Sequence, residues 1–411
     1  MSNNVWEIKK HENLNYILPL HSELAVSDQS HRCLIVVHLY YKDTVERYLP
    51  YFNHLPDYID FAIFTSEEDT EKILRESVIE KENVWIIRKN NRGRDISTLL
   101  VAARTRILES EYVCFVHDKK ERNAETKQDN DRFLDCLWDN MLGSREYIDN
   151  IIATFEQNQS LGVLLPPESL SDNYIFPVQN TWYDNFDEMV KLKDRLDLNC
   201  DLDPDLKPLS LGTAFWARTS ALHKLFAYPW TYEDFLPEPM PIDGTLSHAV
   251  ERCFAYVAQD SGYQTGIVMN DEFAGRRMDE YQEYLYQSFK CLRDYADIAN
   301  LNEINILNTI TRDLRSMYSP QARFYIYGAG DWGEKIARLL RRDHYTILAF
   351  LVSEKGKENE KMGIPIRTID EPLEEDAYVI LAVSDRYKKE MIHNLDERNL
   401  FPGRRYEGAR I

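Results

Sequence analysis

The chain has 411 residues, 44% of them hydrophobic and 29% charged, with a formal net charge of −20. This length suffices for two domains with buried cores, and the composition is that of a globular protein. A strongly acidic chain makes a poor general partner for nucleic acid, so we expect no nucleic-acid partner.

The pattern of cysteines and the distribution of apolar residues both bear on the cellular compartment of the protein. The six cysteines show no CxxC and no metal-ligand spacing, which fits a reducing environment. The N-terminus lacks the apolar core of a signal peptide, and no run of about 18 apolar residues occurs. We expect a cytoplasmic protein, and peripheral association with the inner face of the membrane is compatible with this sequence.

The first half of the chain alternates predicted strands with predicted helices. Residues 1–30 form a polar lead-in. Four apolar segments are predicted strands, at residues 32–41, 60–65, 83–88 and 112–116. Helices are expected between them, at residues 43–51 and 67–79 and after Gly93, where Leu99, Leu100, Ala103 and Ile107 share one face. Such alternation with short connections predicts a parallel sheet covered by helices on both faces.

The second half predicts a continuation of this domain, a helical connector and a small third region. Expected elements are helices at 133–141, 148–157, 219–226 and 248–260, strands at 161–167 and 211–218, and a proline-rich loop over the site at 229–241. A helix broken near Asn300 precedes strands at 323–327, 347–352 and 378–383. We therefore predict an α/β chain with a nucleotide-sugar-binding domain at 31–277, a helical connector at 278–319 and a Rossmann-like domain at 320–411.

Polar side chains stand where the predicted strands end. His38 and Thr65 close the first two strands, and His117-Asp118-Lys119 closes the fourth. Ligands bind open α/β sheets at the carboxyl ends of their strands. The segment from Arg88 to Arg106 adds six basic residues to this region of an acidic chain, which we expect to contribute to a local basic pocket.

Five short motifs carry a resemblance to a known family. They are V-V-H-L-Y-Y-K-D, N-R-G-R-D-I, F-V-H-D-K, G-T-A-F-W-A-R and H-A-V-E-R, in that order between about Arg32 and Gly275. Together they resemble the rhamnan synthesis protein F family. The resemblance implies a GT-A-like glycosyltransferase of bacterial surface polysaccharide synthesis, often a rhamnosyltransferase, with a nucleotide-sugar donor and a glycan or lipid-linked glycan acceptor.

The donor site is expected at the turn and strand end of the second and third motifs. Asn91, Gly93, Arg94 and Asp95 would hold the base, ribose or phosphates of the donor. Many glycosyltransferases hold a divalent metal with Asp-x-Asp at a strand end, but His117-Asp118-Lys119 offers one carboxylate, which is poor for Mg²⁺. Either Asp118 holds Mg²⁺ or Mn²⁺, or Lys119 supplies the cation itself; we favour metal independence.

Inversion at the anomeric carbon requires a general base for the acceptor hydroxyl. The candidates are Asp243, after the proline-rich loop, and Glu251 in H-A-V-E-R, although a turn residue and an ion-paired residue are equally good interpretations. Further candidates on the acceptor side are Trp216, Trp230, His248 and Arg252. Core packing is the better interpretation for Trp216, and a packed or capping role for His248.

A second nucleotide-binding pattern occurs near the C-terminus. Gly328, Gly330 and Gly333 form a GxGxxG that follows a predicted strand and opens a helix. The acidic residue expected about 20 positions further on is absent, so we do not expect NAD. Two alternatives to a glycosyltransferase stay open: a non-catalytic assembly protein with this domain as its binding module, and an enzyme acting on NAD or a nucleotide sugar at Gly328.

Overall fold

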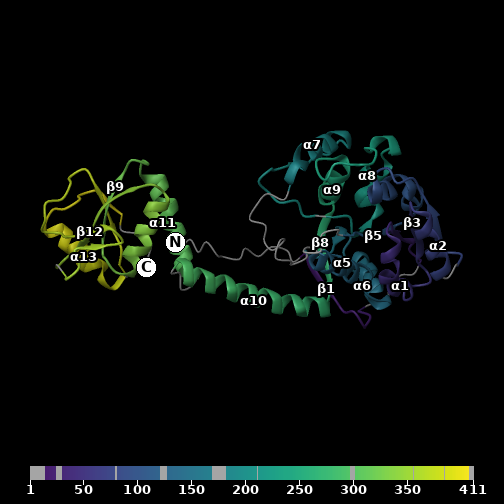
Figure 1. Cartoon of the computed structure of the whole chain (residues 1–411), viewed down its shortest axis with the longest axis horizontal. Helices are drawn as coiled ribbons and strands as arrows, with labels where there is room; N and C mark the ends of the chain where they lie inside the picture. The colour runs from purple at the N-terminus through teal and green to yellow at the C-terminus, as the bar shows by residue number, and fades with distance from the viewer. Residues whose placement is uncertain are drawn as a thin grey trace. The chain divides into compact units, whose positions relative to one another are not determined.

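The computed structural model describes residues 14–24, 30–78, 81–120, 127–168, 182–210, 212–296, 301–354, 356–383 and 385–406. The chain divides into an N-terminal unit, His11–Asp279, and a C-terminal unit that contains Glu280–Ile411 (Figure 1). The division falls within helix α10, Asp271–Ala296. Within the described residues, the helices lack the length and apolar character that crossing a membrane requires.

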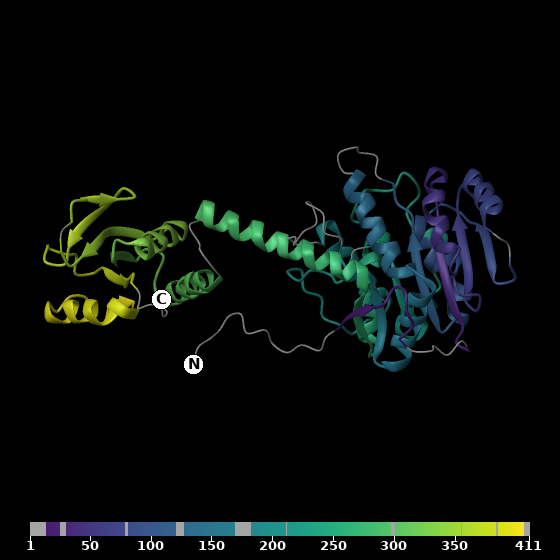
Figure 2. The ribbon, with the colours of Figure 1, turned by 90° about the horizontal axis from the view of Figure 1, so that it is seen from below.

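The N-terminal unit is built on a mainly parallel sheet flanked by helices (Figure 2). Its eight strands follow the order β1-β8-β6-β7-β5-β2-β3-β4. β7 is the exception, since it pairs antiparallel with both β5 and β6. The strands are β1 (Asn15–Leu18), β2 (Cys33–His38), β3 (Asp60–Thr65), β4 (Val84–Arg88), β5 (Tyr112–His117), β6 (Leu161–Leu165), β7 (Phe215–Arg218) and β8 (Gln264–Asn270).

Helices cover both faces of this sheet because alternate strand residues point to opposite sides. Leu34 and Val36 of β2 join one apolar core, whereas Ile35 and Val37 join the other. The first core is covered by α3 (Arg94–Ser97), η2 (Thr98–Ala102), α4 (Arg104–Glu109), α7 (Phe186–Arg195), η4 (Thr219–Leu222), α8 (His223–Ala227) and α9 (Leu246–Asp260). The second is covered by α1 (Val45–Phe52), α2 (Glu68–Ser77), α5 (Lys127–Leu142) and α6 (Arg145–Gln157). The predicted α/β class is confirmed.

The segment after Gly93 forms three consecutive helical pieces: α3, the π-helical η2 and α4. Leu99, Leu100, Ala103 and Ile107 are fully buried in the first core, so the predicted shared face is confirmed. Short 3-10 turns complete the unit: η1 (Lys42–Thr44), η3 (Tyr183–Asn185) and η5 (Tyr232–Asp234).

Two strands of the large sheet were not predicted. β1 lies in what we interpreted as a polar lead-in, and it pairs in parallel with β8. β8 has the sequence Q-T-G-I-V-M-N, in which polar residues and a glycine interrupt the apolar pattern. Both strands sit at one end of the sheet, where pairing with a neighbour rather than a long apolar run defines them. Leu211, the first residue of a predicted strand, lies outside the described residues.

The C-terminal unit has its own sheet, in the order β11-β12-β10-β9-β13-β14. All pairs are parallel except β11 with β12. Its elements are α11 (Leu301–Met317), β9 (Arg323–Tyr327), α12 (Asp331–Arg342), β10 (Thr346–Val352), β11 (Glu360–Lys361), β12 (Ile364–Thr368), β13 (Tyr378–Leu381), α13 (Asp385–Glu397) and β14 (Arg405–Tyr406). The five parallel strands follow the order 3-2-1-4-5, the order found in doubly wound nucleotide-binding sheets.

Candidate functional site

The site is built where parallel strands of the large sheet end. His38 of β2 and His117 of β5 are in register, so their side chains emerge side by side at the carboxyl edge. The backbone N–H of Asp118 donates to the carbonyl of His38 at 3.0 Å. The turn that follows β4 brings Asp95 within electrostatic reach of both histidines. The structure therefore brings together three of the predicted donor-side residues.

Asp118 is turned inward and is nearly fully buried. Its carboxylate accepts the backbone N–H groups of Tyr40, at 2.9 and 3.0 Å, and of Tyr41, at 2.8 Å. The hydroxyl of Thr44 donates a further hydrogen bond at 3.2 Å. Burial nevertheless raises the pKa of Asp118 to about 6. Through these hydrogen bonds, Asp118 at the end of β5 holds the backbone that follows β2; we call this the clamp role of Asp118.

This arrangement does not suit a divalent cation. Both oxygens of Asp118 already accept hydrogen bonds from the protein. A search of the described part of the chain finds no group of three or more His, Cys, Asp or Glu side chains placed to hold a metal ion. Mg²⁺ and Mn²⁺ favour several oxygen ligands. The residues present do not fit such an ion, and no catalytic step through a metal follows from them.

The two histidines are held differently. His38 is buried, its Nδ1 lies 2.8 Å from the hydroxyl of Thr98, and burial lowers its pKa to about 3. His117 is half-buried, and its Nδ1 lies 2.8 Å from the carbonyl of Asp118. A carbonyl only accepts, so Nδ1 of His117 donates in this contact. His117 is therefore the accessible member of the pair.

Two other predicted donor-side residues occupy opposite environments. Thr65 is fully buried, and its hydroxyl accepts the N–H of Glu67 at 3.2 Å at the start of α2. The prediction that Thr65 contacts the donor is therefore wrong, because its side chain closes a helix end inside the core. Lys119 is exposed, with its ammonium 5.5 Å from the centre of the Phe133 ring.

Gly93 is required by the shape of the turn between β4 and α3. Its φ of +80° lies in the left-handed region, and a Cβ there would approach Phe235 Cγ to 2.6 Å. Phe235 belongs to the proline-rich loop between α8 and α9, so this close approach docks the loop on the turn. The guanidinium of Arg94 pairs with Glu238 of the same loop at 2.7 and 3.1 Å. The expected loop over the site is present and is fastened to the turn.

The basic segment does not form one phosphate-binding patch. Arg92 donates to the carbonyl of Phe235, Arg104 to the carbonyls of Phe226 and Ala227, and Arg106 lies over Trp85. These arginines fasten loops and helices to one another. Arg92, Arg104 and Arg106 are therefore engaged with the protein itself, and they do not support a basic pocket.

Lys89 is one of the six basic residues of this segment, but no separate role was expected for it from the sequence. Its ammonium donates to the hydroxyl of Ser97 at 2.8 Å and to the carbonyl of Arg94. Burial lowers the pKa of Lys89 to about 7, against the opposing effect of Asp95. A lysine directly after a buried strand was the available signal. Its contacts hold the start of α3 in place.

The acceptor-side candidates lie at and before the N-terminus of α9, which packs against α3. The carboxylate of Asp243 accepts from the Asn185 amide at 2.5 Å and from the backbone N–H of Asp184 at 3.1 Å. Burial opposes ionisation here, but these hydrogen bonds hold the pKa of Asp243 below its usual value. Asp243 is therefore an anchored carboxylate and a weak base.

Unlike Asp243, Glu251 has a raised pKa, and this makes it a stronger candidate for the base. Its side chain is 27% exposed, and its carboxylate is 3.7 Å from the Arg252 guanidinium. Burial, followed by the nearby charge of Asp95, raises the pKa of Glu251 to about 7, against the attraction of Arg252, His117 and Lys119. A pKa near neutrality suits a general base. Glu251 is thus within electrostatic reach of three donor-side residues, and its raised pKa makes it a better candidate base than Asp243.

His248 and Arg252 support this end of α9. His248 Nδ1 is 2.8 Å from the hydroxyl of Thr245 and 4.0 Å from the carboxylate of Asp243. Burial lowers the pKa of His248. Arg252 is nearly fully buried and donates to the carbonyl of His248 at 2.7 Å. These contacts fix the geometry of the helix start around Glu251.

Neither tryptophan can stack on a sugar. Trp216 is fully buried and donates from Nε1 to the carbonyl of Met141 at 2.8 Å. Trp230 is 3% exposed and donates to the carbonyl of Leu225 at 2.7 Å. Both belong to apolar cores, so their assignment to the acceptor side is wrong. Their indole N–H groups are satisfied by backbone carbonyls, which is how a buried tryptophan is normally accommodated.

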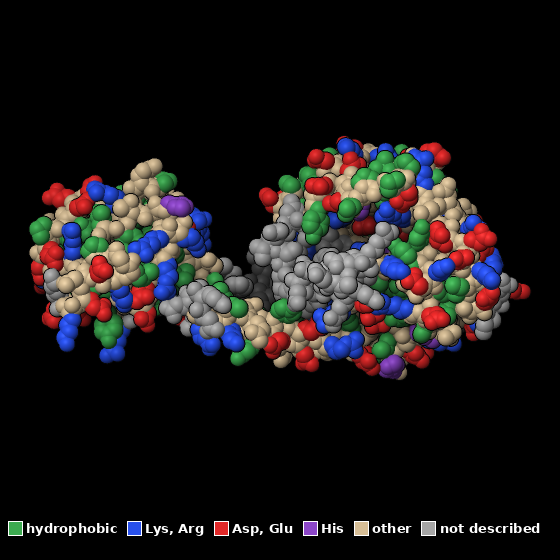
Figure 3. Space-filling model, in the orientation of Figure 1, with side chains coloured by type: hydrophobic (Ala, Val, Ile, Leu, Met, Phe, Trp, Pro, Cys, Tyr) green, Lys and Arg blue, Asp and Glu red, His purple; other side chains and the backbone are tan. Residues whose placement is uncertain are grey.

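Buried polar atoms without hydrogen-bond partners gather on the segments that meet here. Most such atoms in a folded protein are satisfied, so each exception needs an explanation. Among the described residues, those on these segments are Asn91 Oδ1, Asp95 Oδ2, Ser210 Oγ, Thr213 Oγ1, Ser247 Oγ and Arg252 Nε. A hollow with acidic side-chain atoms inside it is visible on one face of the N-terminal unit (Figure 3). Unpaired buried polar atoms of this kind are expected where a protein binds a polar ligand.

The glycine-rich loop of the C-terminal unit has the expected local geometry. Gly328 has a φ of +115°, and a Cβ on Gly333 would approach the Gly328 carbonyl to 2.1 Å, whereas a Cβ on Gly330 would meet nothing within 4 Å. Lys361 donates to the Ala329 carbonyl at 2.9 Å and pairs with Glu334. The ammonium of Lys361 is thus engaged by the loop carbonyl and by Glu334, and these contacts give no indication of a phosphate site.

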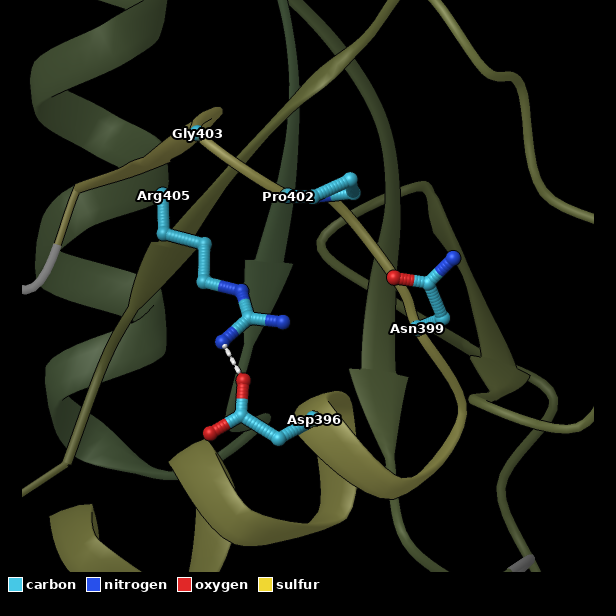
Figure 4. Close-up of a pocket in the computed structure, with 5 residues that line it drawn as sticks. All are labelled: Asp396, Asn399, Pro402, Gly403 and Arg405. Carbon is cyan, nitrogen blue, oxygen red and sulfur yellow. Dashed lines mark hydrogen bonds and ion pairs between the residues drawn. The ribbon is translucent and has the colours of Figure 1, made fainter.

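A cavity of about 370 Å³ in this unit lies elsewhere. It is lined by Asp396, Asn399, Pro402, Gly403 and Arg405 (Figure 4). Arg405 extends toward Asp396 of α13 and forms an ion pair with it. Because Arg405 is in register with Val379 near the start of β13, the cavity lies at the opposite end of the sheet from the glycine-rich loop. It offers no support for a nucleotide at Gly328.

Comparison with known proteins bears on the N-terminal unit. The profile of the family described as rhamnan synthesis protein F matches residues 1–263. The chain belongs to this family. Membership supports a glycosyltransferase role in the synthesis of surface polysaccharide, and the resemblance of the five motifs is confirmed.

Two further similarities, to a curated protein and to a solved structure, do not bear on the function of this chain. The chain is 29% identical over 180 residues to the uncharacterized protein WxcX in two strains of Xanthomonas campestris pv. campestris. The match spans 43% of this chain and 24% of WxcX, so most of that protein has no counterpart here. The crystal structure of S. aureus TarS 1–349 aligns with a TM-score of 0.27 at 12% identity over 57% of each chain. A score this low supports no conclusion about this protein.

Proposed function

We propose that this protein is an inverting glycosyltransferase with a GT-A-like N-terminal unit. It moves a sugar from a nucleotide donor onto a surface polysaccharide or lipid-linked glycan acceptor. L-Rhamnose from dTDP-L-rhamnose is the first donor to test, because the family is described by rhamnan synthesis. The observation that carries the proposal is Glu251, a carboxylate of raised pKa on α9, which packs against α3 and lies within electrostatic reach of Asp95, His117 and Lys119.

The reaction can be assigned to these residues. Glu251 removes the proton of the acceptor hydroxyl, whose oxygen attacks the anomeric carbon from the face opposite the leaving group. The bond from that carbon to the diphosphate oxygen breaks, and the electron pair leaves with the nucleoside diphosphate. Lys119 supplies a positively charged donor near the developing negative charge, as stabilisation of a leaving diphosphate requires, and His117 lies next to it along the chain. The proton finally resides on Glu251 and returns to solvent.

The test is transfer of radiolabelled sugar from dTDP-L-rhamnose, and from a panel of other nucleotide sugars, into bacterial membrane fractions that supply lipid-linked acceptors. Label should enter the lipid-linked or polysaccharide fraction with wild-type protein and with Glu46→Gln, an exposed glutamate on α1. Glu251→Gln should abolish incorporation. Absence of transfer with every donor would contradict the proposal.

A second candidate is favoured by one observation. Because Asp118 is held by the backbone of Tyr40 and Tyr41, this carboxylate is not free to serve as the acidic metal ligand that many glycosyltransferases place at a strand end. A non-catalytic assembly protein whose C-terminal unit binds the nucleotide would share this feature. Nucleotide binding without transfer, located at residues 328–333, would support that candidate instead.

A further inference from the structure

Buried acceptor atoms of the site that have no hydrogen-bond partner limit the kinds of ligand group that can bind there. From their position and charge we infer that Asp95 binds a hydroxyl group on the transferred sugar ring, and not the diphosphate or the nucleoside. This inference rests on the proposed function and concerns the same site. It makes Asp95 a residue that determines which donor sugar is accepted.

The first argument is chemical. Asp95 Oδ2 is buried and has no hydrogen-bond partner within the described residues. Burial would raise the pKa of Asp95, but the nearby imidazole of His117 and hydrogen bonding to the backbone hold this pKa below its usual value, so the group is an ionised acceptor at neutral pH. A diphosphate is itself an anion with acceptor atoms only, and it would be repelled. The partner must therefore bring a donor, which a sugar hydroxyl does.

The second argument is positional. Asp95 lies close enough to Glu251 for its charge to raise the pKa of that residue. A base that deprotonates the attacking hydroxyl works next to the anomeric carbon, within about 3 Å of the acceptor oxygen. The group beside it is then the sugar ring, whereas the nucleoside lies beyond the two phosphates. The α3–α9 packing keeps Asp95 and Glu251 on adjoining elements.

Neighbouring contacts support a preorganised acceptor rather than a flexible one. Lys89 holds the carbonyl of Arg94 and the hydroxyl of Ser97 on either side of Asp95. Thr213 approaches the carboxylate from the segment before β7 closely enough to lower its pKa, while its own hydroxyl meets no hydrogen-bond geometry in the described structure. A site built to hydrogen-bond a hydroxyl discriminates strongly against a sugar that lacks it, because the buried acceptor is then left unpaired.

The experiment compares each nucleoside diphosphate with its own sugar by isothermal titration calorimetry on the full chain. The pairs are dTDP with dTDP-L-rhamnose and UDP with UDP-glucose. Variants are Asp95→Ala, Asp95→Asn, which keeps the shape and one acceptor oxygen, and Asp60→Asn as a control. Asp60 begins β3, at the opposite end of the strands from the site. Melting curves verify that each variant is folded.

For the pair that wild type binds, we expect Asp95→Ala to weaken the nucleotide sugar at least about 10-fold, the effect of a lost hydrogen bond to a charged group. The diphosphate alone should bind at least as tightly as to wild type, Asp95→Asn should be intermediate for the nucleotide sugar, and Asp60→Asn should match wild type. Equal weakening of diphosphate and nucleotide sugar, or no change in either, overturns the inference while leaving the proposed function intact. Failure of wild type to bind any pair overturns both.

Discussion

Replacing Glu251 by glutamine separates the catalytic role of this residue from its structural cost. The pKa of Glu251 is raised from 4.5 to about 7 in the folded protein. Between these values the folded state binds more protons than the unfolded state, so stability falls as pH rises through this window and the penalty is complete above pH 7. A shift of this size corresponds to at most about 3 kcal/mol. Glutamine carries no charge and removes the penalty.

Glu251→Gln should therefore be more stable than wild type at pH 8 and indistinguishable from it below pH 4.5, as measured by urea unfolding at both pH values. Its turnover should fall by about 100-fold or more, the loss expected for a missing general base. Wild-type turnover should rise with pH up to about 7 as Glu251 deprotonates. Glu46→Gln provides the matched control. A variant that keeps wild-type turnover, or whose stability gain does not depend on pH, would refute this reasoning.

Three further substitutions test the geometry. Gly93→Ala should cost about 1–3 kcal/mol of unfolding free energy and weaken donor binding, because a Cβ would strike Phe235; wild-type melting would contradict this. Trp216→Phe should cost about 1–3 kcal/mol by leaving the Met141 carbonyl unpaired, with the acceptor KM unchanged; a raised KM would restore the sugar-stacking role. Asp118→Ala should cost at least about 2 kcal/mol in urea unfolding, and wild-type transfer should survive EDTA; complete loss restored by Mn²⁺ would contradict the clamp role.

The elements around the site were predictable because apolar runs mark buried parallel strands. The segments of β2, β3 and β5 and the shared face of Leu99 and Ile107 follow from hydrophobic pattern alone. The edge strand β1 and its neighbour β8 carry no such run, since partial exposure relaxes the pattern. They are defined by pairing, β1 with β8 and β8 also with β6, which no local signal reports.

Side-chain roles were less predictable than positions. The sequence placed His117, Asp118 and Lys119 together, but which of them faces inward depends on the Tyr40 and Tyr41 backbone, far along the chain. Sequence alone provided no reason to prefer Asp243 or Glu251 as the base. Only the contact with Asn185 shows that Asp243 is the anchored carboxylate. Trp230 was expected on the acceptor side, and its burial and its hydrogen bond to the Leu225 carbonyl place it in the core instead.

Hydrogen–deuterium exchange of the full chain, with and without a nucleotide sugar that it binds, tests the central claim most directly. Amides that a ligand orders exchange more slowly, and the affected peptides locate the site. We predict slower exchange in residues 90–98, 117–119 and 246–252, and none in residues 328–333. Protection confined to residues 328–333 would contradict the donor site at the carboxyl ends of β2 and β5 and assign nucleotide binding to the C-terminal unit.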